Sequence, residues 1–233
     1  MGYVDLLSCN HRYGSQTYLG IKFMNLWGNY KTALYDILPD LTFGRAWASW
    51  KSKKTYLLAK TFTHPHIIKS REVEIWNEKS CIYNNIIYPK TGSNLPCFGM
   101  DLMGFLDQKV IIVVDFQHPV ENYPYSVDGL PVYEGDYRFF EIGNHFSKNI
   151  YIAKCTMSEV DEHLDMFKTF LTKYNDMLEL EKPTGKDTSE YKDFETYMTK
   201  LDPVSGYLTG KFGKEQSESL VHDFLFEYGM VAS

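Results

Sequence analysis

The sequence has few cysteines, no excess of positive charge and no long apolar run. Its 24 basic and 30 acidic residues give a formal net charge of −6, which argues against electrostatic binding to nucleic acid or to an anionic membrane. The longest apolar run, Val110–Val114, is far shorter than the roughly 20 residues of a membrane-spanning helix. The 4 cysteines include no C-x-x-C pair and no metal-site spacing, so we expect a reduced, cytoplasmic protein.

Signatures of resident cofactors are also absent. The chain contains no G-x-G-x-x-G, no P-loop, no G-x-S-x-G and no H-E-x-x-H. Ligand-type residues occur at Asp115, His118 and His145, and Glu72 and Glu74 point the same way. However, two residues three apart on a strand face opposite sides unless the chain bends, which separates Asp115 from His118. We therefore expect no metal site and assign the chemistry to dispersed side chains.

Aromatic residues are in excess. The sequence has 18 Tyr, 15 Phe and 4 Trp, which together make up 16% of the chain. Such a surplus suits a thick core, and it also suits a site for a large, flat, apolar ligand. A chain of 233 residues buries roughly 70% or more of its unfolded surface, so it needs neither disulfides nor a metal to fold.

Apolar periodicity predicts strands in the first part of the chain and helices in the last third. A helical stripe begins at Leu26 and ends at Pro39. Strands are predicted over residues 54–62, 71–76, 81–88, 109–116, 137–142 and 149–155. Further helical stripes follow over residues 160–178, 191–201 and 220–228.

Strands grouped ahead of helices favour a largely antiparallel sheet with helical layers on it, an α/β fold. The segment Val110–Val114 is apolar on both faces, so we expect it to be central in a sheet that is covered on both sides. No linker or repeat divides the chain, and residues 21–233 are predicted to form a single domain. Residues 1–20 show no sustained periodicity, which predicts a loose N-terminal arm.

Three polar residues are candidates for chemistry. Asn84 stands on an otherwise apolar strand face, although a buried asparagine with a backbone partner would give the same pattern. Asp101 lies between apolar and flexible residues. If it is buried, its protonated form is favoured and it can donate a proton. The alternative is an aspartate in a turn, which would be solvated or bonded to the backbone. Asp202 precedes Pro203, which is also the pattern of a helix N-cap.

Four segments resemble the ferredoxin-dependent bilin reductases, and most closely their phage-type branch that forms phycoerythrobilin. They are residues 87–103 with the Pro-Cys-Phe-Gly-Met-Asp motif, 110–119, 137–147 and 201–207. The resemblance extends from about Phe23 to Phe226 and leaves residues 1–20 uncovered. It implies a three-layer α/β/α sandwich, in which a central antiparallel sheet is flanked by helices and the bilin lies between the sheet and the C-terminal helices.

The resemblance also implies the chemistry. These enzymes bind no flavin, haem or metal, and they reduce biliverdin IXα through radicals with single electrons from an external 2Fe-2S ferredoxin. Asp101 matches the family's sheet-side aspartate near the pyrrole nitrogens, and Asp202 matches the helix-side aspartate of the synthase type. Asn84 stands where phycocyanobilin-forming relatives carry a histidine, which favours phycoerythrobilin as the product.

Five further residues are candidate substrate contacts by the same resemblance. Glu72 falls where the phycocyanobilin-forming relatives use a glutamate. Lys211 matches a basic position near the C-terminus that would bind the bilin propionates. Ser147, Lys148 and Arg71 are further candidates for these carboxylates.

The predicted activity is the four-electron reduction of biliverdin IXα, through 15,16-dihydrobiliverdin, to phycoerythrobilin. One alternative is a two-electron reductase that stops at 15,16-dihydrobiliverdin, and another is a non-catalytic carrier of a planar tetrapyrrole. We expect a monomer in the cytoplasm of a cyanobacterial or phage-infected cell.

Ferredoxin is the expected protein partner, in a transient electrostatic complex. Because ferredoxins are acidic and this chain is itself negative, docking requires a local basic patch. Lys148, Lys200, Lys211 and Lys214 are expected near the mouth of the bilin site. A second cluster, expected to be more distant, comprises Lys51, Lys53 and Lys54.

Overall fold

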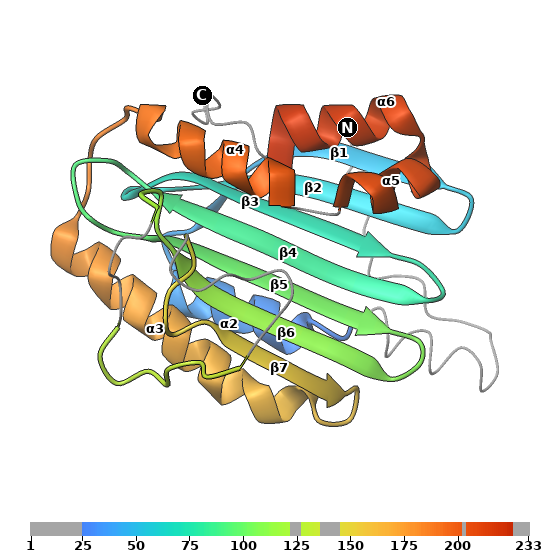
Figure 1. Cartoon of the computed structure of the whole chain (residues 1–233), viewed down its shortest axis with the longest axis horizontal. Coiled ribbons are helices and arrows are strands. Elements are labelled where there is room, and N and C mark those ends of the chain that lie inside the picture. Colours follow the sequence, from blue (N-terminus) through green and yellow to red (C-terminus); the bar gives the residue numbers. More distant parts are fainter. Residues whose placement is uncertain (1–24, 122–126, 136–144, 202–203, 226–233) are drawn as a thin grey trace.

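The computed structural model describes residues 25–121, 127–135, 145–201 and 204–225 (Figure 1). The predicted arm over residues 1–20 and the predicted strand over residues 137–142 lie outside these ranges. The strands are β1 (Thr42–Ser52), β2 (Thr55–His64), β3 (Ile67–Trp76), β4 (Ser80–Pro89), β5 (Cys97–Phe105), β6 (Lys109–Gln117) and β7 (Tyr151–Thr156). The helices are α2 (Gly28–Ile37), η1 (Val160–His163), α3 (Leu164–Glu181), η2 (Ser189–Tyr191), α4 (Lys192–Leu201), α5 (Val204–Phe212), α6 (Lys214–Leu220) and η3 (Val221–Leu225).

The seven strands form one sheet in the order of the chain, and each strand pairs antiparallel with the one before it. Helices α2 and α3 cover one face of the sheet, and α4, α5, α6 and η3 cover the other (Figure 1). The predicted α/β class with an antiparallel sheet between helical layers is therefore confirmed. No helix in the described ranges is both long and apolar enough to cross a membrane.

The face under α2 and α3 is filled by one continuous apolar core. Aromatic rings stack through it, with Phe116 on Phe170 at 5.5 Å between centroids and Phe98 on Tyr174 at 5.1 Å. The Tyr30 hydroxyl donates to the backbone oxygen of Val160 over 2.8 Å, which joins α2 to η1, the short helix directly before α3. Buried aromatic side chains fill much of this layer, and others, such as Tyr88, Phe194 and Phe224, pack on the opposite face.

The apolar periodicity of the sequence predicts neither β1 nor β5. The edge strand β1 exposes most of its residues and shows no clean alternation, because one of its sides has no neighbouring strand. The strand β5 contains two glycines and Asp101, residues that are typical of turns.

The segment Val110–Val114 lies in β6, beside the edge strand β7, so the prediction of a central position was wrong. It is buried on both faces for another reason. Val110, Ile112 and Val114 belong to the core under α3. Val113, on the other face, packs against Phe146 and Ile150 of the segment that precedes β7.

Replacing Leu171 of α3 with alanine should lower the free energy of unfolding by about 2–5 kcal/mol, because the side chain is fully buried in the continuous core. The matched control is Leu180→Ala in the same helix, where the side chain is 82% exposed and the expected change is within about 0.5 kcal/mol. Urea unfolding followed by circular dichroism measures both. Equal losses in the two variants would contradict the packing described here.

Candidate functional site

Asn84 and Asp101 lie directly opposite each other on β4 and β5. The strand register pairs Asn84 with Asp101, and Asp101 in turn with Val113. Side chains of directly opposed residues share a face of the sheet, with Cβ atoms roughly 4.5–5.5 Å apart. Both side chains are half-buried and lie on the face that α4, α5 and η3 cover. An amide and a carboxyl group therefore stand side by side on this face.

Arg71 fixes the orientation of Asn84. Its side chain is buried, its Nη1 donates to Oδ1 of Asn84 over 2.6 Å, and its Nε donates to the backbone oxygen of Leu225 over 2.8 Å. Because the guanidinium can only donate, Asn84 accepts through its oxygen and keeps its amide N–H groups for another partner. One buried cation thus links the sheet to η3 and aligns the amide beside Asp101.

The face that carries this pair is covered differently from the other face. Its buried apolar residues divide into three clusters, under α5 and η3, under α4, and beside residues 146–150. Met198 of α4 packs against all three clusters. Between them lies a strip of half-buried side chains, which we call the half-buried strip: Ile82, Asn84, Asp101, Met103 and Ile111. A flat apolar surface with one amide and one carboxyl group suits a large planar ligand.

Asp115 is a second carboxyl group on this face, one strand further along. It stands opposite Gly99 on β5 and is completely buried. Ser147 donates to it twice, through Oγ over 2.6 Å and through the backbone N–H over 3.2 Å. Burial raises the pKa of Asp115 well above its usual value, and the hydrogen bonds from Ser147 oppose that rise only in part. The Ser147 hydroxyl proton is therefore directed to Asp115.

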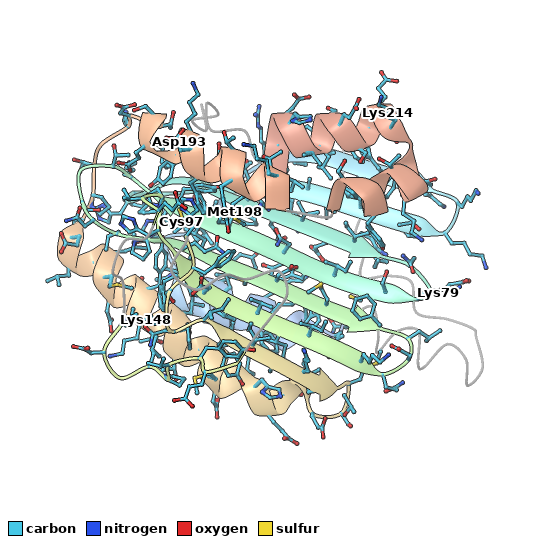
Figure 2. The ribbon with its side chains drawn as sticks, viewed as in Figure 1. Lys79, Cys97, Lys148, Asp193, Met198 and Lys214 are labelled. Carbon is cyan, nitrogen blue, oxygen red and sulfur yellow. The ribbon has the colours of Figure 1, made fainter. Side chains whose placement is uncertain are left out.

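The two lysines predicted as propionate contacts are both exposed and lie apart. Lys211 of α5 holds its Nζ 5.6 Å from the centre of the Tyr207 ring. The Tyr207 hydroxyl in turn lies 3.1 Å from Oγ of Ser80 at the start of β4. Lys148 lies in the segment that precedes β7, on the other side of the view from α5 (Figure 2). Asp202 lies outside the described residues.

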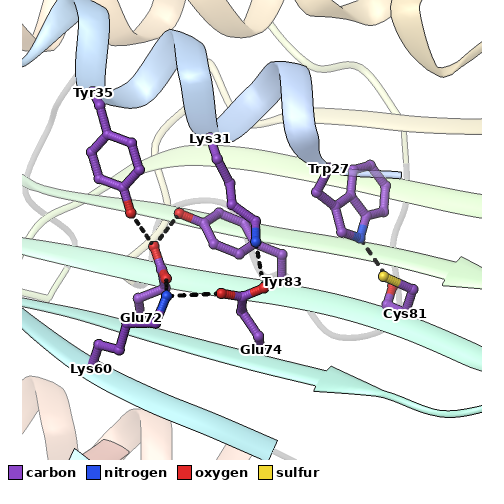
Figure 3. A network of polar contacts seen from close by, with 8 residues as sticks. All are labelled: Trp27, Lys31, Tyr35, Lys60, Glu72, Glu74, Cys81 and Tyr83. Atoms are coloured by element: carbon purple, nitrogen blue, oxygen red, sulfur yellow. Dashed lines mark hydrogen bonds and ion pairs between the residues drawn. The ribbon is translucent and has the colours of Figure 1, made fainter. Parts of the chain in front are cut away.

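Glu72 is not brought together with Asn84 and Asp101. Its fully buried carboxylate lies on the α2 face of the sheet, where it accepts hydrogen bonds from Tyr35 over 2.8 Å, Tyr83 over 2.7 Å and Lys60 over 2.7 Å (Figure 3). The reason is the two-residue period of a strand: the residue of β3 opposite Asn84 is Val73. The predicted common face of Glu72 and Glu74 is present, and Lys60 contacts both carboxylates.

The residues weighed as metal ligands make other contacts. Nδ1 of His118 accepts the backbone N–H of Val120 over 3.1 Å. Nδ1 of His145 lies 2.9 Å from the backbone oxygen of His118. Within the described ranges, ligand-type atoms gather at Asp40, His64 and Glu179, within 4.8 Å of one another. There Nδ1 of His64 accepts the backbone N–H of His66 over 3.1 Å. The neutral ring therefore carries its proton on Nε2, which does not favour a metal ligand.

The sequence did not predict a buried ion pair beneath α4, between Lys69 and Glu195. Nζ of Lys69 on β3 lies 3.6 Å from Oε1 of Glu195 on α4, and the two side chains are 6% and 1% exposed. Lys69 also lies over the Tyr88 ring, 5.3 Å from its centre. The pair joins α4, which carries Met198 over the half-buried strip, to the sheet. Residues so distant in the chain leave no local sequence signal.

Comparison with known proteins agrees with this architecture. Residues 39–227 match the family model of the ferredoxin-dependent bilin reductases. The chain belongs to this family. A 15,16-dihydrobiliverdin:ferredoxin oxidoreductase from Nostoc punctiforme is 29% identical over 169 residues, which cover 64% of this chain and 69% of that protein. The corresponding protein from Gloeobacter violaceus is 27% identical over 169 residues, with the same coverage of 64% and 69%.

A solved structure shares the fold. The crystal structure of phytochromobilin synthase from tomato, in complex with biliverdin, superimposes with a TM-score of 0.63 at 16% identity. The match covers 84% of this chain and 81% of that one. The match of residues 39–227 to the family model confirms the resemblance of the sequence to this family.

Replacing Asp115 with asparagine should change how stability depends on pH. Because the folded state raises the pKa of Asp115, the native protein favours the neutral carboxyl group, and ionisation costs stability as the pH rises above the unfolded-state pKa of about 3.9. The unfolding free energy of the wild type minus that of Asp115→Asn should therefore fall from about pH 4 upward. Urea unfolding across that range measures the difference, and Asp176→Asn on the exposed side of α3 is the control. A difference that rises with pH contradicts this account.

Proposed function

We propose that this bilin reductase converts biliverdin IXα, through 15,16-dihydrobiliverdin, to phycoerythrobilin, with four single electrons from a 2Fe-2S ferredoxin and no flavin, haem or metal of its own. The observation that carries the proposal is the pairing of Asn84 with Asp101 on the half-buried strip. Family membership supplies the electron donor and the substrate class. We propose further that it acts as a monomer in the cytoplasm of a cyanobacterial or phage-infected cell. The free cysteines Cys81, Cys97 and Cys155 support a reducing compartment.

The protein's part in this reaction is to bind, orient and protonate the bilin. Each two-electron step takes up two protons, and a carboxyl group in apolar surroundings is suited to donate them. Asp101 is the sheet-side acid. Asn84 cannot donate a proton as a histidine would, and Arg71 holds it as a fixed hydrogen-bonding group. Proton donation therefore rests on aspartates, with Asp202 as the proposed acid from the helical side.

The second candidate function is a two-electron reductase that stops at 15,16-dihydrobiliverdin. It is favoured by the names of the Nostoc and Gloeobacter relatives, which are 15,16-dihydrobiliverdin:ferredoxin oxidoreductases. An anaerobic assay with biliverdin, ferredoxin and a ferredoxin-reducing system separates the two. Chromatography should show 15,16-dihydrobiliverdin early and phycoerythrobilin at completion. Accumulation of 15,16-dihydrobiliverdin alone would replace the proposal with this second candidate.

Asp101→Asn should keep biliverdin bound and lower turnover by about 10²–10⁴-fold, because the amide preserves the shape of the side chain but has no acidic proton. Absorbance titration measures the binding, and initial rates measure the turnover. The matched control is Asp107→Asn in the exposed turn after β5, which should leave both unchanged. Wild-type turnover in Asp101→Asn would remove Asp101 from the reaction, whereas biliverdin binding without any turnover in the wild type would leave the non-catalytic carrier.

Asp202→Asn should stall the reaction at 15,16-dihydrobiliverdin. The amide preserves a helix cap and removes one proton source, while Asp101 remains for the first reduction. Product chromatography over a full time course measures the ratio of the two bilins. Phycoerythrobilin formed at the wild-type rate would show that Asp202 is only the helix cap that its sequence context suggests.

A further inference from the structure

Exposed lysines gather at one end of the sheet, where the β1–β2 and β3–β4 turns meet α5. We call this surface the hairpin-end patch. It consists of Lys51, Lys53 and Lys54 at the β1–β2 turn, Lys79 at the β3–β4 turn and Lys211 near the end of α5. Figure 2 shows Lys79 at this end of the molecule. Lys51, Lys53 and Lys54, which the sequence predicts to be more distant from the bilin site, lie at the same end of the sheet as Lys211.

Side-chain contacts hold the three segments together. Tyr56 and Trp76 stack at 5.6 Å between ring centroids, and Nζ of Lys51 lies 5.1 Å from the centre of the Tyr56 ring. These side chains share the α2 face of the sheet with Glu72 and Glu74. On the opposite face, the rings of Trp50 on β1 and Phe212 on α5 lie 5.7 Å apart between centroids, which places the β1–β2 turn beside the end of α5. The Tyr207 hydroxyl reaches Oγ of Ser80 over 3.1 Å and, as noted above, carries Lys211 over its ring. The lysines therefore surround one end of the sheet, with Lys51 on the α2 face, Lys211 on the α5 face and the two turns between them.

The patch keeps an excess of positive charge. Within the described ranges, only Lys54 of its five lysines forms an ion pair, with Glu78 over 2.5 Å, and those side chains are 75% and 66% exposed. Exposed pairs of this kind are worth little. Two further exposed lysines lie beside carboxylates, Lys109 beside Asp107 and Lys214 beside Glu218. In a chain of net charge −6, this local excess of positive charge can attract an acidic protein.

The patch is also close to the half-buried strip. Ser80, which Tyr207 contacts, begins β4 and lies four residues before Asn84 on the same strand. At roughly 3.3 Å per residue, that separation is about 13 Å. An electron donor bound to the patch would thus stand near the strip without covering it. The half-buried Tyr56–Trp76 pair supplies an aromatic contact among the charges, as protein interfaces commonly have.

We propose that the hairpin-end patch is the docking surface for the acidic ferredoxin that supplies the electrons, an inference that rests on the proposed function. Long-range attraction would guide the donor to this end, and the complex would dissociate after each electron. Lys148 lies elsewhere on the molecule and does not take part in the docking.

Charge reversal at Lys51 and Lys79 tests the proposal. The double variant K51E/K79E should raise the KM for ferredoxin about tenfold or more and leave kcat at saturating ferredoxin within about twofold, because steering acts on association. The control K168E/K192E changes the net charge equally, at exposed positions on α3 and α4, and should leave the KM within about twofold. Equal effects of the two double variants, or no effect of either, would overturn the proposal.

Two further measurements separate this inference from the proposed function. Biliverdin binding, followed by absorbance, and its reduction by a small-molecule reductant need no docking surface, and both should be the same in wild type and K51E/K79E. If the wild type neither binds nor reduces biliverdin, the proposed function is wrong. Isothermal titration calorimetry with oxidised ferredoxin and no biliverdin tests the patch directly. Binding weakened by K51E/K79E alone supports the proposal, and binding unchanged by it contradicts the proposal.

Discussion

Apolar packing between one face of the sheet and the helices α2 and α3 is the interaction on which the rest of the structure depends. It forms a single continuous core, and burial of that size is the dominant favourable term in folding. Because one face supplies this burial, the other face can leave polar side chains in half-buried positions. Asn84 and Asp101 are half-buried polar groups of this kind, and Asp115 is a fully buried carboxyl group on the same face.

The candidate site combines a fixed hydrogen-bonding group with groups that can exchange a proton. Arg71 donates hydrogen bonds to Asn84 and to the backbone oxygen of Leu225. Because its guanidinium is always charged, the charge at this part of the site does not change. Asp101 and Asp115 can each exist in two states. Under the proposed function, the amide of Asn84, held by Arg71, would orient the bilin and Asp101 would donate protons to it.

Sequence patterns gave the helix that begins near Leu26 and ends before Pro39, most of the strands and the common face of Glu72 and Glu74, because period and turn chemistry are local properties. They failed for β1 and β5, where an open edge and two glycines hide the alternation. The resemblance to the family supplied Asp101 and Asn84. The hydrogen bonds from Ser147 to Asp115 and the Lys69–Glu195 ion pair join distant parts of the chain. Only the folded sheet brings these residues together, so no local pattern indicates them.

The strand order has a consequence for how the chain is made. Since β1 to β7 follow the order of synthesis, each strand finds its partner in the strand that left the ribosome just before it. Nearest-neighbour pairing of this kind keeps contacts short in sequence, which favours fast folding. The sheet and the layer of α2 and α3 are complete once Glu181 has emerged. The helices that cover Asn84 and Asp101 are synthesised last, so the face that carries this pair is the last part of the sheet to be covered.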